Sequence, residues 1–489
     1  MRVRCLGPSA RRTPGVEPDP LARLAAVPLI LLEFNELSPP VIKKLMAAGE
    51  LPNFERFHNE AEVHETEADE RAPNLEPWIQ WVTVHTGIPY RDHGIERLGD
   101  GHELDEPNLW DYVSDRSGSV WVCGSMNINY RSPINGWVLP DPWVTKVRPH
   151  PEEELRPYYR FVSANVQEHT REEAPLARSE QLAFVSFMVR HGLSPATATA
   201  IVRQLASERR SNTRWRRPVI LDRVQFDLFR WHWRKAKPTF STFFLNSTAH
   251  YQHLYWRHMD PESFEVKPDP AERTIYEDAI PYGYRQMDRM VGQFLDLAGD
   301  DTTLVLLTAL SQEPCLKYED IGGKMMYRPK DFERLLEALD IGEPADSAPV
   351  MAEEFQLDFA TEEGARDAES KLAAVRYRGQ PAIRVERRGR NIFGACGIVE
   401  QVEPDAVLQV DGGDRTVSFF DLFYQLDLVK SGIHHPDGLM WIRTPARTHS
   451  VNREKVPLVS AAPTVLRLMD IDPPDRMQGE ALEAAGVSA

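Results

Sequence analysis

The stretch VPLILLEFNE, from Val27 to Glu36, decides the fold. Its apolar part, Val27–Phe34, is too short to cross a membrane. It also lacks the alternation of apolar and polar residues that is typical of a strand with one face in solvent. It therefore predicts a strand buried on both faces of a parallel sheet. Similar runs predict further core strands at Ser119–Cys123, Thr239–Leu245, Thr302–Leu307 and Leu439–Ile442.

Helical patterns lie between some of these runs. Pro39–Ala48 has apolar residues at helical spacing and ends at Gly49, while Asp288–Leu297 and Ala462–Met469 precede or follow other runs. Strands that alternate with helices predict an α/β fold, with a mostly parallel sheet flanked by helices on both faces. Such sheets bind ligands at the carboxyl ends of their strands, so the residues after each strand carry the functional information.

The pattern divides the chain into four parts. Residues 25–149, 238–314 and 433–489 form the predicted core, and residues 1–24, rich in Arg, Pro and Gly, form a predicted disordered extension. Residues 150–237 are charged and helical, and residues 315–432 mix helices with short β segments, so we expect a helical insertion and a cap-like insertion. The basic and aromatic stretch Arg214–Lys237 favours an amphipathic helix packed on the core; the alternative is capture of an anionic substrate, acidic surface or partner.

The composition limits the compartment and the partners. The net charge of −17 argues against general nucleic-acid binding, which usually leaves a basic footprint. The four cysteines are scattered, and no apolar run approaches the roughly 18–20 residues of a membrane span. We therefore expect a cytoplasmic protein without a transmembrane segment that takes a small anionic substrate, and leave its oligomeric state open.

Carboxylates, imidazoles and amides recur where the predicted strands end. Any one of them could be a turn former or a helix cap, but together they supply the hard oxygens and imidazole nitrogens of a divalent-metal site. The residues in question are Glu33, Asn35, Asn74, Glu76, Asn127, His250, His253, Gln312, Glu313, His434 and His435.

The order of short motifs resembles that of the alkaline phosphatase superfamily, particularly its type I phosphodiesterase/nucleotide pyrophosphatase branch. The matching segments are GELPNF at 49–54, WVTVHTG at 81–87, DHGI at 92–95, AHYQHLYW at 249–256, HPDG at 435–438 and the closing segment at 461–479. The resemblance implies an alkaline-phosphatase-like sheet and a site that holds divalent metal.

The chain departs from the family at the site itself. The position of the first metal-binding Asp holds Glu33, no Ser or Thr nucleophile stands near Asn74 to Pro77, and the Asp of the D-x-x-Q-H motif is Ala249. Gln312 and Glu313 occupy the place of an Asp-His pair. The resemblance thus implies Glu33, His253, Glu313 and His435 as metal ligands, with zinc, manganese or iron as the ion.

The remaining polar residues complete the predicted site. Glu76 is a candidate metal ligand or general base and Asn74 stands at the nucleophile position, so both are candidate catalytic residues. The predicted substrate-binding residues are Asn35, Asn127, His250, Gln312 and His434. We expect a metal-dependent enzyme that hydrolyses or transfers a phosphoryl or other anionic group without a hydroxyl nucleophile; the alternatives are a rebuilt iron or manganese site with oxidative chemistry, and a non-catalytic ligand-binding descendant.

Overall fold

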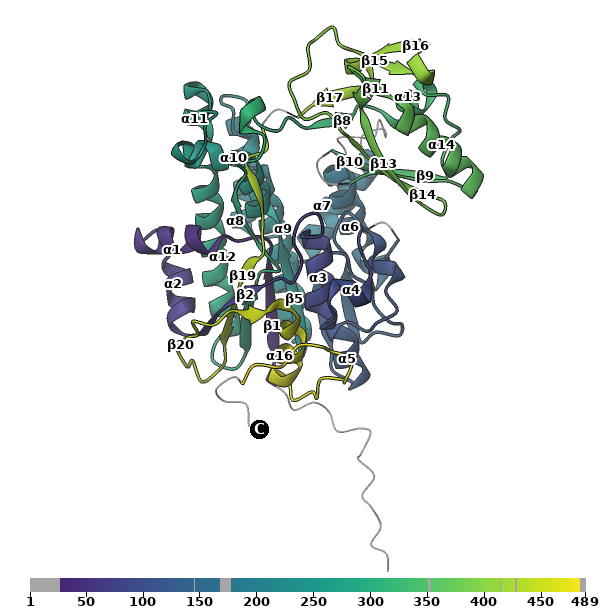
Figure 1. Cartoon of the computed structure of the whole chain (residues 1–489). Helices are drawn as coiled ribbons and strands as arrows, with labels where there is room; N and C mark the ends of the chain where they lie inside the picture. Colours follow the sequence, from purple (N-terminus) through teal and green to yellow (C-terminus); the bar gives the residue numbers. More distant parts are fainter. Residues whose placement is uncertain are drawn as a thin grey trace, which may run out of the picture.

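The computed structural model describes residues 27–144, 146–167, 177–350, 353–413, 415–426 and 429–483 (Figure 1). The predicted disordered extension, residues 1–24, lies outside this part of the chain. None of the helices in the described part combines the length and the apolar composition that a membrane crossing requires.

A nine-stranded sheet forms the centre of the molecule. β1 (Leu29–Phe34) lies between β5 (Phe240–Leu245) and β6 (Thr303–Leu307) and is parallel to both, while β19 (Asp437–Arg443) is antiparallel to its neighbours. The predicted mixed α/β class with a mostly parallel sheet is therefore confirmed. The full order is β20 (Ser450–Val451), β2 (Glu62–Glu67), β19, β6, β1, β5, β3 (Val120–Cys123) and β4 (Gly136–Leu139), with β21 (Val456–Pro457) paired to β2.

Helices cover both faces of the sheet because alternate residues of β1 point to opposite sides. Ile30, Leu32 and Phe34 belong to one hydrophobic cluster, and Leu29 and Leu31 belong to another. The first cluster is covered by α1 (Pro39–Ala47), α2 (Pro52–Asn59), α9 (Arg217–Ala236), α10 (Ser247–Met259) and α12 (Ala279–Ala298), and the second by α3 (Pro77–Thr86), α5 (Leu109–Asp115) and α16 (Ala461–Leu468).

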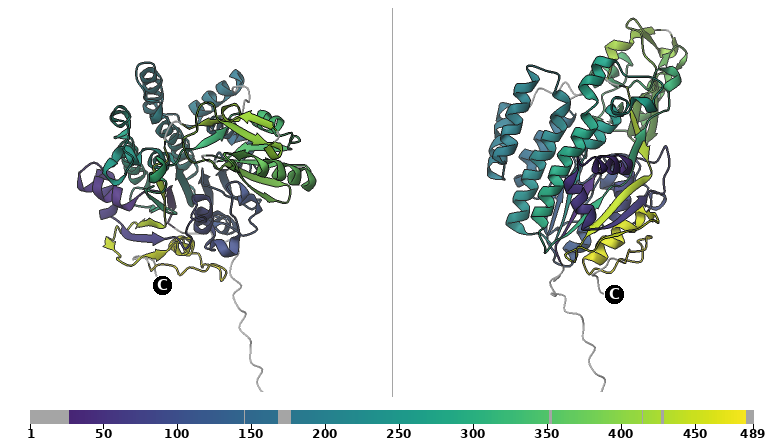
Figure 2. Two further views of the ribbon diagram at one scale, coloured as in Figure 1. Left: turned by 45° about the horizontal axis from the view of Figure 1, so that its top comes forward. Right: turned by 90° about the vertical axis from the view of Figure 1, so that its left-hand side faces the viewer.

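Three further helices, α6 (Glu152–Gln167), α7 (Arg178–Arg190) and α8 (Pro195–Glu208), precede α9. They stand on one side of the molecule, as the right-hand view of Figure 2 shows. Within α9 the aromatic residues Phe229 and Trp233 are buried in the core, and Phe229 stacks on Trp121 of β3. The aromatic part of the Arg214–Lys237 stretch thus packs on the core, as an amphipathic helix would.

The segment after β6 builds a smaller α/β unit with its own hydrophobic cluster, in which Phe355, Leu372 and Phe423 are buried. We call this unit the cap; Figure 1 shows it at the upper right. The division of the chain into four parts itself stays a prediction. The cap elements are β8 (Tyr327–Pro329), α13 (Phe332–Ala338), β9 (Asp346–Pro349), β10 (Glu354–Asp358), α14 (Glu362–Ala374), β11 (Arg376–Tyr377), β12 (Gln380–Pro381), β13 (Ile383–Arg388), β14 (Asn391–Cys396), β15 (Val407–Val410), β16 (Arg415–Ser418), α15 (Phe419–Leu422) and β17 (Phe423–Gln425).

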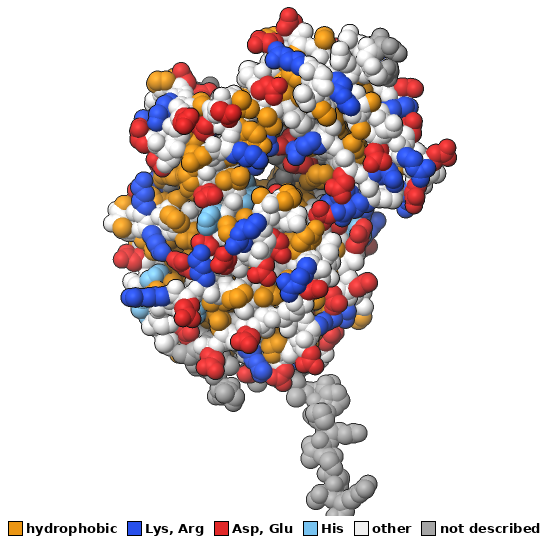
Figure 3. Space-filling model, viewed as in Figure 1, with side chains coloured by type: hydrophobic (Ala, Val, Ile, Leu, Met, Phe, Trp, Pro, Cys, Tyr) orange, Lys and Arg blue, Asp and Glu red, His pale blue; other side chains and the backbone are white. Residues whose placement is uncertain are grey.

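Two short antiparallel strands connect the cap to the core. β7 (Ser311–Pro314) leaves the sheet after β6, and β18 (Gly432–His435) returns beside it before β19. The molecular surface is hollowed between the cap and the core, and basic side chains border the hollow (Figure 3).

Candidate metal centre

Three potential metal ligands meet at the carboxyl end of β1. They are Glu36, just after β1, His253 in α10 and His434 in β18, and one ligand atom of each lies within 4.8 Å of the others. The Nε2 atoms of His253 and His434 lie 3.0 Å and 3.4 Å from the same Glu36 oxygen, Oε2. Two imidazoles and one carboxylate are a common ligand set for a single divalent ion.

Backbone carbonyls fix the orientation of both imidazoles. The Nδ1 of His253 lies 3.2 Å from the Gly432 carbonyl, and the Nδ1 of His434 lies 2.9 Å from the Leu75 carbonyl. A carbonyl oxygen only accepts hydrogen bonds, so each Nδ1 carries a proton and each Nε2 faces Glu36. The Nε2 of His434 is buried and makes no hydrogen bond. Metal-binding histidines typically have this arrangement, with one nitrogen anchored and the other free to coordinate.

A buried hydrogen-bonded chain holds the backbone at Glu36, whose φ of 61° lies in the left-handed region. Gln252 donates from Nε2 to the Glu36 carbonyl at 2.6 Å and accepts at Oε1 from the Tyr284 hydroxyl at 2.7 Å. That hydroxyl accepts from the Ser38 backbone N–H at 2.8 Å. The chain stabilises a conformation that a non-glycine residue adopts at a cost.

Neutral amides bind the Glu36 side chain from two directions. Asn35 donates from Nδ2 to Oε1 at 2.7 Å, and Gln312 donates from Nε2 to Oε2. Burial alone would raise the pKa of the Glu36 carboxyl, but His434 and His253 outweigh it and hold this pKa well below its usual range. The Glu36 side chain is therefore an anionic carboxylate at neutral pH.

The two imidazoles differ in their electrostatic surroundings. Burial, aided by the charges of His434 and Lys430, lowers the pKa of His253 although the Glu36 carboxylate acts to raise it. At His434 the effect of burial is overcome by Glu36 and by a second carboxylate, Glu76, so the pKa of this imidazole is raised. Glu36 thus raises the pKa of both imidazoles, whereas Glu76 adds to this effect at His434.

Glu76 and Asn74 lie just before the N-terminus of α3, next to this cluster. The Glu76 Oε2 is 3.3 Å from the His434 Nδ1, and burial raises the pKa of the Glu76 carboxyl. Asn74 is half-buried, and its carbonyl accepts from Gln80 at 3.3 Å. Glu76 is therefore placed where an acid or base could act on a molecule bound to the cluster, and no hydroxyl side chain stands beside it between Asn74 and Pro77.

Charged residues of the cap lie near Glu76. Glu353 forms an ion pair with Lys324, and burial together with Glu353 raises the pKa of Glu354 to about 8. Glu76 also raises the pKa of Glu354, and Lys430 lowers that of Glu76, so cap and core groups share one electrostatic environment.

The structure does not bring Glu33, one of the four predicted metal ligands, to this cluster. Glu33 points to the opposite side of the sheet from Phe34 because side chains alternate along β1. There its Oε1 lies 2.9 Å from the Nε2 of His85 in α3, and both side chains are fully buried. Glu36 is the carboxylate that joins the two imidazoles, because the chain turns just after the strand.

Glu313 and His435 also lie outside the cluster. In the β7–β18 pair, Gln312 lies opposite His434, and Ser311 lies opposite His435. Adjacent residues of a strand point to opposite faces, so Gln312 and His434 face Glu36 while Glu313 and His435 face away. The latter two are more exposed. The His435 Nε2 lies 3.9 Å from the Glu313 Oε2, and the His435 Nδ1 accepts from the Asp437 N–H at 3.2 Å.

The predicted substrate-binding residues have separate roles in the structure. Asn35 and Gln312 support Glu36, and His434 is one of the three potential ligands. Asn127 is engaged by backbone groups, accepting from the N–H groups of Gly99 and Gly101 and donating to two carbonyls. His250 is exposed on α10.

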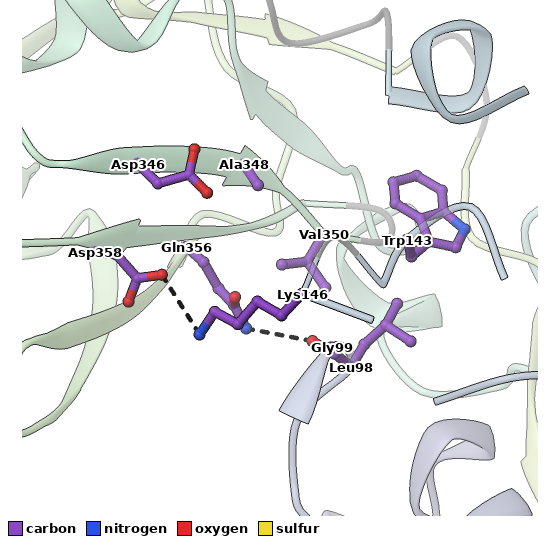
Figure 4. Close-up of a pocket in the computed structure, with 9 residues that line it drawn as sticks. All are labelled: Leu98, Gly99, Trp143, Lys146, Asp346, Ala348, Val350, Gln356 and Asp358. Carbon is purple, nitrogen blue, oxygen red and sulfur yellow. Dashed lines mark hydrogen bonds and ion pairs between the residues drawn. The ribbon is translucent and has the colours of Figure 1, made fainter. Parts of the chain in front are cut away.

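Two other features lie away from this cluster. Asp100, His102 and Glu103 gather on η1 (Asp100–Glu103), a single surface turn. A cavity of about 20 Å³ separates the loop at Leu98 from β9 and β10 of the cap. Figure 4 shows it bridged by Gln356, which donates to the Leu98 carbonyl, and by an ion pair of 3.7 Å between Lys146 and Asp358. These contacts attach the cap to the core.

No protein-family model and no curated protein matches this chain. Among solved structures, it is similar to murine ectonucleotide pyrophosphatase/phosphodiesterase 5, inactive and in complex with AMP, with a TM-score of 0.41 and 10% identity over 93% of this chain and 97% of that chain. It is also similar to phosphonoacetate hydrolase from Sinorhizobium meliloti 1021 in complex with phosphonoformate, with a TM-score of 0.39 and 12% identity over 90% of this chain and 96% of that chain.

Proposed function

We propose that this chain is a metal-dependent enzyme that acts on a phosphorylated or other anionic small molecule, with one divalent ion held by Glu36, His253 and His434. One observation carries the proposal: both imidazoles are anchored through Nδ1 and turn Nε2 to the same carboxylate oxygen. A bound cation could be coordinated by the two Nε2 atoms and the Glu36 carboxylate together.

The ligand count supports one ion rather than two. Among the described residues at this site, Glu36, His253 and His434 converge, whereas Gln312 offers an amide that donates to Glu36. Three protein ligands are typical of a catalytic centre that keeps positions for water and substrate. When bound, the ion would supply Lewis acidity and a water that is more easily deprotonated.

The surrounding residues support the assignment to an anionic substrate. Lys430 acts electrostatically on His253, His434 and Glu76, and Lys324 lies on the same side of the cap. Cationic groups beside a cleft raise the local concentration of anions. Glu76 is our candidate for the acid or base, since burial raises its pKa and the segment from Asn74 to Pro77 contains no Ser or Thr.

The same ligand set also fits an oxidative enzyme. Two histidines and one carboxylate with open positions bind Fe(II) in oxygen-dependent enzymes that contain no haem. We retain this as the second candidate, and zinc, manganese and iron all remain candidate ions. The cytoplasmic location also stays a prediction; Cys123, Cys315 and Cys396 are buried and free.

Metal analysis of two adjacent-residue variants tests the proposal. Protein purified without added metal should contain close to one equivalent of one divalent ion. His434→Ala should lose it, and His435→Ala, the matched control on the opposite face of the strand, should keep it. Equal metal contents in the two variants, or only traces of many metals in the wild type, would refute the proposed centre and favour a non-catalytic descendant.

Activity assays separate the two candidate reactions. Hydrolysis of p-nitrophenyl phosphate or bis(p-nitrophenyl) phosphate that is lost in His434→Ala and by chelation supports the first. Oxygen consumption by the iron-loaded protein, with no phosphoester hydrolysis, supports the second. Glu76→Gln should lower the turnover while the metal content is retained, because the acid–base group and not a ligand is changed.

A further inference from the structure

A groove lies between α8, α9 and α12, and its lining includes none of the three potential ligands of the metal centre. Figure 2 shows the three helices side by side, and the groove has a volume of about 670 Å³. This lies within the range of roughly 300–1,000 Å³ that small-molecule sites occupy. Its lining includes Arg203, Arg216, Arg223, Arg289, Gln286 and Tyr282.

Four arginines line this groove, and no acidic side chain does. Arg223 and Arg289 both donate to one neutral acceptor, the Gln286 Oε1, at 2.6 Å and 3.3 Å. Their guanidinium groups are thus drawn together by an amide although their charges repel. Within the described residues, no carboxylate forms an ion pair with any of the four.

The nearest acidic residues of α8 and α9 are already engaged. Glu208 binds Arg217 through both oxygens, at 2.8 Å and 2.7 Å, and Asp222 accepts a hydrogen bond from Ser247. Arg217 does not line the groove. Asp222 also interacts electrostatically with Arg223, whereas no described carboxylate forms an ion pair with Arg203, Arg216 or Arg289. Most of the positive charge of the groove is therefore not compensated by its own helices.

Arg216 is held in place by aromatic rings. Its guanidinium carbon lies 4.8 Å from the centre of the Trp215 ring and 5.2 Å from that of Tyr282, and its buried Nε has no hydrogen-bond partner. A guanidinium fixed in this way loses little side-chain entropy when it binds an anion.

The charge of the surrounding segment is opposite to that of the whole chain. Residues 177–237 contain 13 Lys and Arg but only four Asp and Glu, a net charge of +9, whereas the chain as a whole carries −17. This segregation concentrates positive potential on the side of the molecule where the groove lies.

We propose that the groove is a binding site for a small molecule with two or more phosphate groups. Guanidinium groups match phosphate oxygens through paired hydrogen bonds, and four of them that form no ion pair with a described carboxylate fit a polyanion better than a single phosphate. This site shares no residue with the metal centre, so it stands independently of the proposed function.

Isothermal titration of the full chain with inorganic pyrophosphate and tripolyphosphate tests the site. We expect both to bind more tightly than inorganic phosphate, and Arg223→Gln with Arg289→Gln to weaken binding by about tenfold per arginine. Thr199→Glu places a carboxylate on an exposed lining residue and should weaken binding without disturbing the fold. Arg209→Gln, an exposed residue that does not line the groove, is the matched control.

Several results would overturn the proposal. It fails if pyrophosphate and tripolyphosphate do not bind, or if Thr199→Glu and the double variant bind them as the wild type and Arg209→Gln do. It also fails if phosphatidylserine vesicles bind in an arginine-dependent manner and pyrophosphate does not, since the surface would then recognise a membrane. Circular dichroism of each variant verifies its fold, and Thr199→Glu decides the outcome if the double variant does not fold.

Discussion

Replacing Tyr284 by Phe removes one fully buried oxygen and leaves the ring in place. That hydroxyl accepts from the Ser38 N–H and donates to the Gln252 Oε1, and both partners are buried. The substitution therefore leaves one donor and one acceptor without partners. Since each unsatisfied buried group costs roughly 1–3 kcal/mol, we expect the free energy of unfolding to fall by about 2–4 kcal/mol.

Urea denaturation followed by tryptophan fluorescence measures this loss. Tyr282→Phe, at a half-buried position of the same helix, is the control and should change the free energy of unfolding by less than about 0.5 kcal/mol. Because Gln252 also holds the Glu36 carbonyl, Tyr284→Phe should weaken metal binding by about tenfold, as is common when a group that supports a ligand is removed. A Tyr284→Phe protein as stable as the control would refute the role assigned to the hydrogen-bonded chain.

Three further predictions concern stability. Gly432→Ala should destabilise the fold by roughly 1–3 kcal/mol in urea denaturation, because a Cβ there would lie 2.2 Å from the Gln312 Oε1; an unchanged midpoint would contradict this. His85→Leu should cost about 3–5 kcal/mol in the same assay, since it leaves the buried Glu33 carboxylate without its partner, and a loss below about 1 kcal/mol would argue against that pair. Burial lowers the pKa of His93 from 6.5 to about 4, so the unfolded chain binds a proton at this residue at a higher pH than the folded chain does. The free energy of unfolding should therefore fall by up to about 3 kcal/mol as the pH drops from 6.5 to 4. His93→Gln should flatten that pH dependence.

The core strands could be predicted from the sequence because their apolar runs are long and continuous. The runs at 27–34 and 239–245 correspond closely to β1 and β5. β2, Glu62–Glu67, was missing from the prediction because its sequence, EVHETE, is polar, although most of it is buried. Its place in the sheet comes from pairing with β19 and not from an apolar pattern of its own.

The composition of the candidate site was easier to predict than the identity of its members. The sequence predicts carboxylates and imidazoles at the strand ends, and His253 lies in the cluster. Choosing between Glu33 and Glu36 requires the turn that follows β1, and choosing between His434 and His435 requires the pairing register of β18. Both choices depend on which face a side chain takes, and one residue of offset reverses that face.

The three potential ligands come from the beginning, the middle and the end of the chain, at positions 36, 253 and 434. During synthesis, His434 leaves the ribosome only after the cap has been made, so a nascent or prematurely terminated chain holds at most two of the three. Metal uptake would then occur after β18 has paired with β7, a contact that requires the whole intervening cap to have been made. The rate of metal incorporation would therefore report how quickly the whole chain reaches its final topology.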